Sequence, residues 1–477
     1  MVQGVGRVGV AVLCSVGVLL ATFAGYAGAT ASDGITPATG SESGEWDAHE
    51  RYLEHSLVTE PEQLTDEEVR HISNLRESYG LRTDAAFIRS LYSNPSAHQA
   101  RISLHSLLAG ILYTPDEEQQ VYRRAAAEWV GAQVDLIAVD HVSNYAGTFI
   151  EPTGVVSLRC APCDPEEVTL LRASLDVDEQ YELHAKDVKY SMDELHATAE
   201  KLSSDLHARG ISHGGSISVE RNRTEMFIEN SGSDVGIEIP PSVTVEGDFV
   251  EETPDVDKND PIVYGLVIGG QYITGSGTAL TSGFAVEGAY GPFILTAGHY
   301  AYPSICTGEG DDWFQGGSRL GVMSSACQYG GDADGALIST FGHRVNWGRI
   351  HYTSTDWDEP VTFGVSTHSL EGQTVCQTGA STTGMSGDLN TSSRCGNVIS
   401  TAASSPCGGA NPAWTFSLGR ASYLRNSGDS GAGVVWPTIY GFGAAGTHSC
   451  IGFNSTGAIF SRYSVMANKW GLSLTAS

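Results

Sequence analysis

A histidine, an aspartate and a serine stand far apart in this sequence, each beside small or apolar residues that could hold it for chemistry. His299 ends the stretch FILTAGH, Asp334 lies in GGDADGALIST, and Ser430 lies in NSGDSGAGVV. A serine hydroxyl is a poor nucleophile unless a base takes its proton, and an imidazole can accept a proton near neutral pH. A histidine after a strand is, taken alone, more often structural. Together with Gly-Asp-Ser-Gly, His299 is better interpreted as the base of a nucleophilic serine.

Such a serine also needs donors for the oxyanion and a carboxylate that orients the base. Gly428 allows the backbone to turn so that its own N–H and that of Ser430 point at one place. Asp334 is followed by small and then apolar residues, which predicts a buried strand, and a buried carboxylate can hold the imidazole in one tautomer. Asp332, in the preceding glycine turn, is a weaker candidate. Four further aspartates in polar stretches are weaker still: Asp311, Asp312, Asp356 and Asp358.

The chain order His299, Asp334, Ser430 distinguishes between fold families that carry such a triad. An α/β-hydrolase has the serine first and a glycine two positions after it, where this chain has Ala432. LTAGH, DGALI and GDSG resemble the three catalytic motifs of the chymotrypsin-type serine peptidases. VCQTGASTTG followed by CGNV is similar to a pattern of the bacterial streptogrisin and alpha-lytic protease branch. The resemblance covers about residues 265–477, and it implies a serine-type endopeptidase built as a double six-stranded antiparallel β-barrel.

The resemblance also bears on the six cysteines of this portion. It implies a Cys376–Cys395 disulfide. The branch usually joins two cysteines at positions that are Leu280 and Tyr300 here, so both partners are replaced together, and we expect Tyr300 to pack beside the histidine loop. The usual cysteine shortly before the catalytic serine is also missing. An even cysteine count in a secreted domain predicts disulfides, and the remaining pairs we expect are Cys306–Cys327 and Cys407–Cys450.

Substrate selection depends on a different stretch, AAGTHSC, which resembles the strand lining the first specificity pocket of this branch. His448, followed by Ser449, falls where glutamate-selective members carry a histidine, and Ser427 falls where they carry a serine. A histidine with hydroxyl groups can bind a carboxylate through charge-assisted hydrogen bonds. The alternative is a structural histidine beside a pocket for a small or apolar side chain, and the sequence leaves both open.

The chain before these motifs differs in composition. It carries 44 acidic and 18 basic side chains up to Leu266, against 12 and 8 from Val267 onward. Arg7, an apolar run and the small residues AGATAS predict a cleaved signal peptide, with an uncleaved membrane anchor as the alternative. The predicted organisation is a signal peptide (1–31), a flexible leader (32–61), an α+β pro-region (62–250), a linker with the activation cleavage, favoured at Leu266–Val267 (251–266), and the peptidase domain (267–477).

Periodicity within the first part predicts helices and a few strands. TDEEVRHISNLRESYG, PDEEQQVYRRAAAEWVGAQVDLIAV and SMDELHATAEKLSSDLHARG are typical of helices, whereas TGVVSLRC and GSISVERNRTEMFIEN are typical of strands. From about Ile262, short β-branched runs alternate with turn residues, which indicates an all-β domain. Cys160 and Cys163 form CAPC, which we interpret as a staple without a catalytic role rather than a redox motif, because no thioredoxin-like context surrounds it.

Several partners are not expected. No stretch is basic enough to bind along the phosphate backbone of a nucleic acid. No His/Cys cluster has the spacing of zinc ligands, and no apolar stretch after the signal is long enough to span a bilayer. We therefore expect a secreted, extracellular monomer without metal or organic cofactor that acts on protein or peptide substrates. The resemblance implies that its own pro-region is a folding template and inhibitor. The alternatives are a secreted binding or adhesion protein on an inactive protease scaffold, and an esterase with the same triad.

Overall fold

The computed structural model divides into two compact units, residues 1–53 and 54–477, and only parts of the second are described here. Among the described residues, no helix is long and apolar enough to cross a membrane. We call residues 56–246 the N-terminal portion and residues 266–475 the barrel portion. The described residues are 56–102, 111–175, 183–228, 239–246, 266–275, 277–299, 306, 308–340, 345–351, 358–364, 370–380, 395–405, 416–423, 428–438, 441–451 and 457–475.

Helices dominate the start of the N-terminal portion and begin where the sequence offers a cap. The Thr65 hydroxyl accepts a hydrogen bond from the Glu68 N–H, and the Glu68 carboxylate accepts one from the Thr65 N–H, so this capping box begins α3. Two short strands pair antiparallel, and the first of them lies within the range expected to be a flexible leader. The elements are β1 (Ser56–Leu57), α3 (Asp66–Ser78), α4 (Ala85–Ser93), the 3₁₀ helix η1 (Pro95–His98), β2 (Arg101–Ile102) and α6 (Glu118–His141).

The rest of the N-terminal portion mixes helices with strands. The described residues include one β-α-β connection, in which β4 leads through α7 to its parallel neighbour β5. Helix α8 then leads into the antiparallel β6–β7 hairpin, which belongs to a different sheet. A disulfide joins Cys160 at the end of β4 to Cys163 in the turn before α7. The elements are β3 (Tyr145–Ile150), β4 (Val156–Cys160), α7 (Pro165–Ser174), β5 (Leu183–Asp187), α8 (Met192–Ala208), β6 (His213–Ser218), β7 (Arg223–Ile228) and β8 (Val243–Glu246).

The first barrel closes through six antiparallel pairings. Two short strands, β11 and β12, act as halves of one bent strand, because Gly283 and Phe284 between them still exchange hydrogen bonds with Leu295. The ring then runs from β10 to β11/β12, β13, β16, β15, β14 and back to β10. The strands are β10 (Tyr272–Gly275), β11 (Thr278–Thr281), β12 (Ala285–Gly288), β13 (Gly291–Thr296), β14 (Asp312–Gln315), β15 (Ser318–Gly330) and β16 (Ala333–Ser339).

The second barrel is a closed ring of the same size. It runs from β19 to β20, β21, β24, β23, β22 and back to β19, and every pairing in it is antiparallel. With the first ring, it confirms the predicted double six-stranded antiparallel β-barrel, which is the chymotrypsin-like fold. The strands are β19 (Thr374–Gln377), β20 (Cys395–Ser404), β21 (Leu418–Ala421), β22 (Gly433–Thr438), β23 (Gly441–Ile451) and β24 (Ala458–Arg462).

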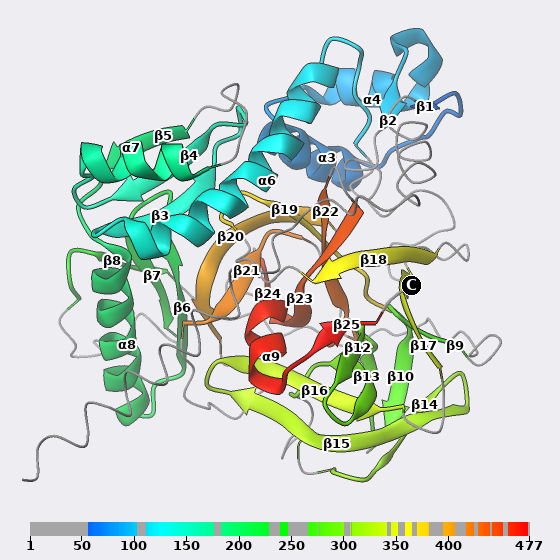
Figure 1. Ribbon diagram of the computed structural model, residues 1–477. Coiled ribbons are helices and arrows are strands. Elements are labelled where there is room, and N and C mark those ends of the chain that lie inside the picture. The colour runs from blue at the N-terminus through cyan, green and yellow to red at the C-terminus, as the bar shows by residue number, and fades with distance from the viewer. Residues whose placement is uncertain are drawn as a thin grey trace, which may run out of the picture. The chain divides into compact units, whose positions relative to one another are not determined.

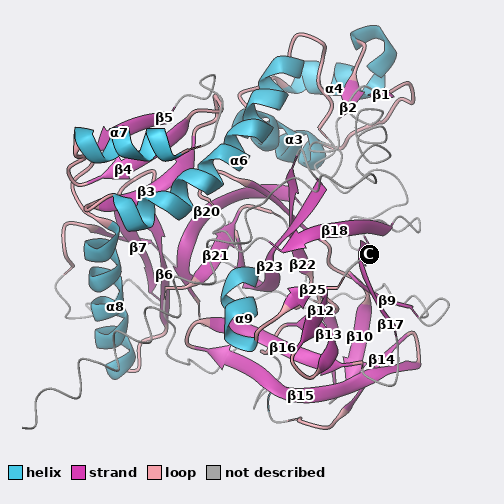
Figure 2. Cartoon of the chain, in the orientation of Figure 1, coloured by secondary structure: helices cyan, strands magenta, loops and turns pink. Residues whose placement is uncertain are grey.

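Further strands and one helix complete the barrel portion. Parallel pairing joins β9 to β17 and β18 to β23, while β25 pairs with β12. Helix α9 ends at Gly471, which has a φ of +62°. Helices gather in the N-terminal portion and strands in the barrels (Figures 1 and 2). The additional elements are β9 (Leu266–Gly269), β17 (Val345–His351), β18 (Asp358–Gly364), α9 (Tyr463–Trp470) and β25 (Ser473–Leu474).

Apolar packing joins the two portions. Val130, Val134 and Ala138 on α6 are buried in the same cluster as Val375 and Trp436 of the second barrel. Burial of aliphatic and aromatic side chains stabilises such a contact by about 1.5–3 kcal/mol per large side chain. Strand β6 also pairs with β20, so the β6–β7–β8 sheet extends the sheet of the second barrel (Figure 1).

Candidate active site

His299 lies three residues beyond the end of β13, where the chain turns away from the first barrel. The N–H groups of Gly298 and His299 both donate to Asp334 Oδ1, at 2.7 and 2.6 Å. A Cβ at position 298 would lie 2.1 Å from the carbonyl oxygen of Gln328, so only glycine fits there. The LTAGH stretch therefore places the imidazole through its own backbone.

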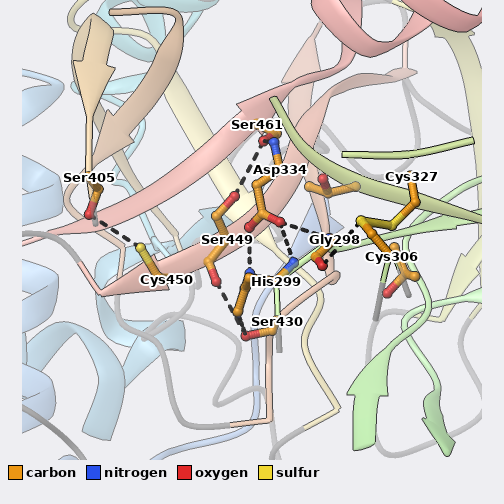
Figure 3. Close-up of polar contacts among 12 residues, drawn as sticks. Gly298, His299, Cys306, Cys327, Asp334, Ser405, Ser430, Ser449, Cys450 and Ser461 are labelled. Carbon is orange, nitrogen blue, oxygen red and sulfur yellow. Dashed lines mark hydrogen bonds and ion pairs between the residues drawn. A yellow bond between two sulfur atoms is a disulfide. The ribbon is translucent and has the colours of Figure 1, made fainter. Parts of the chain in front are cut away.

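Asp334 lies on β16 and is fully buried. Its Oδ2 is 2.5 Å from His299 Nδ1, and its backbone N–H donates to Ser461 Oγ at 2.7 Å (Figure 3). Burial alone would raise the pKa of the Asp334 carboxyl, but the charge and hydrogen bonds of His299, together with the Gly298 N–H, hold that pKa below its usual value. Asp334 is therefore ionised at neutral pH and holds the imidazole with Nδ1 as the donor.

Ser430 lies in the turn before β22, and the structure brings it to the other side of the imidazole. His299 Nε2 is 2.9 Å from Ser430 Oγ, and Oγ is also 3.3 Å from the carbonyl oxygen of Ser449 (Figure 3). Because Nδ1 donates to Asp334, Nε2 is the acceptor for the Ser430 proton. This arrangement can deprotonate the serine as it attacks a carbonyl carbon.

The turn that carries Ser430 is held by Thr281 at the end of β11. The Thr281 hydroxyl donates to the Gly428 carbonyl at 2.7 Å, and its N–H donates to the Ser430 carbonyl at 2.8 Å. Gly428 has a φ of +96°, a conformation that suits glycine. Among the described residues, no acceptor takes the N–H of Gly428 or Ser430, so both remain available to an oxyanion.

Asp429, between those two donors, is anchored in the interior. It is fully buried, and its Oδ2 accepts a hydrogen bond of 2.8 Å from Gln377 Nε2 at the end of β19. A Cβ at Gly379 would lie 1.9 Å from Asp429 Oδ1, which requires glycine at that position too. The sequence motifs do not indicate Thr281, Gln377 or Ser461. A polar side chain within or at the end of an apolar strand was the only available signal for them.

Gly431, directly after the serine, gives a stability prediction. Its φ is +89°, and an added Cβ would lie 2.1 Å from Thr296 Oγ1 and 2.4 Å from the Thr281 carbonyl oxygen. We expect Gly431→Ala to lose about 1–2 kcal/mol of unfolding free energy to the backbone conformation and a further ~1–3 kcal/mol to overpacking. Chemical denaturation measures the loss.

Gly310 is the matched control for this variant. Its φ is +87°, and no atom lies within 4 Å of an added Cβ. Gly310→Ala should therefore lose only the backbone contribution. Equal losses for the two variants would contradict a tightly packed turn at Ser430.

Two of the other candidate aspartates, Asp332 and Asp312, pair with basic side chains instead of the imidazole. Asp332 Oδ1 pairs with Lys469 Nζ at 2.8 Å and accepts from Gln328 at 2.7 Å. Asp312 pairs with Arg319, and it opens β14 rather than lying in a loop. Asp358 likewise opens β18, and Asp356 lies outside the described residues. The structure thus brings Asp334 to His299, whereas Asp332 and Asp312 pair with other side chains.

The specificity residues are described in part. His448 on β23 is buried, with 2% of its surface exposed, and its Nδ1 lies 3.1 Å from the Tyr423 hydroxyl. The two rings meet edge to face, with centroids 5.7 Å apart. Ser449 is buried, and its hydroxyl lies 3.4 Å from that of Ser461, on the Asp334 side of the site. Ser427 lies outside the described residues.

Disulfides flank the site. Cys306 is bonded to Cys327, and its Sγ lies 3.7 Å from the Gly298 carbonyl oxygen, next to His299 (Figure 3). Cys376 is bonded to Cys395, as the resemblance implies. Cys450 is also disulfide-bonded, and its expected partner, Cys407, lies outside the described residues, as does Tyr300. Leu280, in the other half-cystine position, is fully buried in the first barrel.

The described residues contain no cluster of His, Cys, Asp or Glu side chains suited to a metal ion. At the site itself, the structure places an imidazole, a carboxylate, a hydroxyl and backbone N–H groups. These groups suffice for acyl transfer through an oxyanion.

Comparison with known proteins gives structural matches only. Neither a protein-family model nor a curated protein matches the sequence. One similar structure is a glutamic-acid-specific serine protease that uses a histidine triad in substrate binding (19% identity, TM-score 0.35, 44% of this chain and 100% of that one). Others are Nocardiopsis protease (24%, 0.34, 44% and 98%) and Thermobifida fusca protease A (22%, 0.35, 44% and 100%). The chymotrypsin-like fold of the barrel portion rests on its own strand pairings, which close two six-stranded rings.

Proposed function

We propose that the chain is the precursor of a secreted serine endopeptidase that hydrolyses peptide bonds through an acyl-enzyme. One observation carries the proposal: His299 Nε2 lies 2.9 Å from Ser430 Oγ while Nδ1 lies 2.5 Å from the buried Asp334 carboxylate. Such a chain of hydrogen bonds activates a serine hydroxyl at neutral pH.

The reaction follows from these positions. Ser430 Oγ attacks the carbonyl carbon of the peptide bond as His299 Nε2 takes its proton, and the N–H groups of Gly428 and Ser430 stabilise the oxyanion. His299 then gives the proton to the leaving amine, which leaves an ester on Ser430. Water, deprotonated by the same imidazole, hydrolyses the ester and restores Ser430. Asp334 stabilises the imidazolium at each stage.

The precursor organisation is part of the proposal. Residues 1–31 would direct export as a signal peptide, 32–61 would be a leader, and 62–250 would be the pro-region. The linker at 251–266 would be cut to free the peptidase domain at 267–477. Leu266 in β9 already pairs with Val345 in β17. A protease that cuts the Leu266–Val267 bond must therefore first separate the start of β9 from β17. Sequencing the N-terminus of the secreted protein tests this boundary.

The pro-region would act as a folding template and inhibitor for the peptidase. Support comes from the pairing of β6 with β20, because β20 belongs to the ring of the second barrel. Buried side chains of α6 add to this contact: Glu128 accepts hydrogen bonds from Thr374 and from the Trp436 indole N–H. The pro-region would thereby support β19, whose Gln377 contacts Asp429, and β22, which begins directly after the Ser430 turn.

Selectivity for an acidic residue before the cleaved bond is the finer proposal. The Tyr423 hydroxyl lies 3.1 Å from His448 Nδ1 and orients the ring, and an imidazolium held in this way can form a charge-assisted hydrogen bond with a substrate carboxylate. We expect the protein to cleave after Glu at least tenfold more efficiently than after Leu or Phe, and His448→Gln to lose most of that preference. A peptide panel that varies this one residue measures it, and an equal kcat/KM for Glu, Leu and Phe would contradict it.

The endopeptidase proposal is tested by cleavage-site profiling of a mixed peptide pool with the purified protein, with Ser430→Ala as the control. Cleavage within peptides by the native chain, absent from the control, is expected. Hydrolysis of simple esters without any peptide cleavage would favour the esterase alternative instead.

A further inference from the structure

Among the described residues, the contact between the pro-region and the barrels contains three buried glutamates, and two of them are paired with arginines. Glu225 on β7 lies 3.1 Å from Arg420 of β21. Glu128 on α6 lies 3.2 Å from Arg124, four residues before it. Ion pairs of this kind keep both partners charged, because each compensates the desolvation of the other.

The third carboxylate, Glu371, comes from the barrel portion and is only 5% exposed. Its partners are neutral and lie at the end of β6 and in the turn that follows: the Val219 N–H at 2.5 Å, the Glu220 N–H at 3.2 Å and the Ser218 hydroxyl at 3.0 Å. The Ser218 hydroxyl can turn to accept a proton carried by the carboxyl. Its own carbonyl accepts from the Ile150 N–H on β3 at 3.0 Å. The pro-region thus covers Glu371 from two directions.

Charged groups around Glu371 do not neutralise it by direct contact. Arg159 on β4 interacts electrostatically with Glu371, Glu220 and Glu151, and it is itself buried. The Glu220 carboxylate lies on the same turn and repels a charge on Glu371. Arg124 donates a hydrogen bond to the carbonyl oxygen of Gly372, the residue after Glu371. In the described part of the chain, Glu371 forms no ion pair.

We propose that a proton on the Glu371 carboxyl holds the cleaved pro-region on the peptidase, so that the two parts stay together in acid and separate as the surroundings become alkaline. This inference rests on the proposed function, because it presupposes a cut between the two portions. It adds a condition for activation: cleavage alone does not free the peptidase while Glu371 remains protonated.

The direction follows from the two environments of the carboxyl. In the assembled chain, burial raises the pKa of Glu371 to about 8, against the opposing effect of its N–H and O–H donors. After separation the carboxyl meets water, and its pKa returns to about 4.3. The assembled form therefore holds a proton that the separated form releases. The stability that this proton gives to the complex is complete below the pKa of the separated form and is lost as pH rises to the pKa of the assembled form. Between the two, the dissociation constant rises by up to about tenfold per pH unit.

The test uses the full chain with Ser430→Ala, so that it cannot cut itself, and with a recognition site for a sequence-specific protease placed within residues 251–265. After cutting, the release of the pro-region from immobilised peptidase is followed from about pH 5.5 to about pH 9. We expect release to accelerate with pH and then to level off. In Glu371→Gln, which cannot ionise, release should stay slow and nearly independent of pH.

Glu225→Gln is the matched control, because it removes an ion pair in the same interface. It should accelerate release at every pH and keep the pH dependence. The proposal is wrong if Glu371→Gln keeps the slope of the parent, or if release from the parent slows as pH rises.

A second measurement needs no variant at position 371. In the uncut chain with ¹³C-labelled glutamate carboxyl groups, one resonance should titrate near pH 8. If every glutamate titrates below about pH 6, near the ordinary range, the proton is absent and the proposal fails. Neither experiment requires catalysis, so a failure here is distinct from a failure of Ser430 to react in the native chain.

Discussion

Asp334→Asn is expected to lower kcat about ten-thousandfold and to leave KM nearly unchanged. The native carboxylate accepts from His299 Nδ1 and from the N–H groups of Gly298 and His299. An asparagine can turn its own N–H toward Nδ1, which forces the imidazole into the tautomer with a proton on Nε2. That nitrogen then cannot accept the Ser430 proton. Steady-state kinetics on a chromogenic peptide measure the change.

Asp332→Asn is the control for this substitution. Asp332 lies two residues before Asp334, and its carboxylate pairs with Lys469 rather than with the imidazole. Its activity should remain close to that of the parent. Equal losses in the two variants would mean that the effect comes from disturbing the start of β16 and not from the tautomer of His299.

Ser430→Ala should have the largest effect, a fall in kcat of about 10⁶-fold, because it removes the atom that forms the acyl-enzyme. Peptide binding should persist, since the N–H groups of Gly428 and Ser430 belong to the backbone. Kinetics and calorimetric binding of an uncleaved peptide measure the two properties separately.

Ser473→Ala provides the comparison, because Ser473 is an exposed serine on β25. It should behave as the parent in both assays. A Ser430→Ala variant that still cleaves peptides at a substantial fraction of the parent rate would exclude Ser430 as the nucleophile.

Local patterns were enough to predict much of the architecture. Thr65 and Ser191, each followed three residues later by glutamate, mark the starts of α3 and α8, where capping boxes form. The apolar residues after Asp334 mark β16 as a buried strand. Turn residues between short β-branched runs indicate the barrels. These features depend on neighbours in the chain, so the sequence displays them directly.

The supporting contacts of the site could not be predicted in the same way. Thr281, Gln377 and Ser461 contact the catalytic groups from strands 52 to 147 residues away along the chain, a separation at which single-sequence patterns carry no pairing information. The position of Glu371 is a similar case, because its donors Ser218 and Val219 lie more than 150 residues earlier. Such pairs follow from how the sheets close, and only the folded chain reveals them.

The imidazole at position 299 should make one particular hydroxyl reactive, that of Ser430. Covalent labelling of the processed protein with an organophosphorus fluoridate, followed by peptide mass spectrometry, tests this dependence. We expect one label per chain, on Ser430, and labelling slowed by a factor on the order of 10³ or more in His299→Ala. A label on another residue, no label, or unchanged labelling in His299→Ala would contradict it.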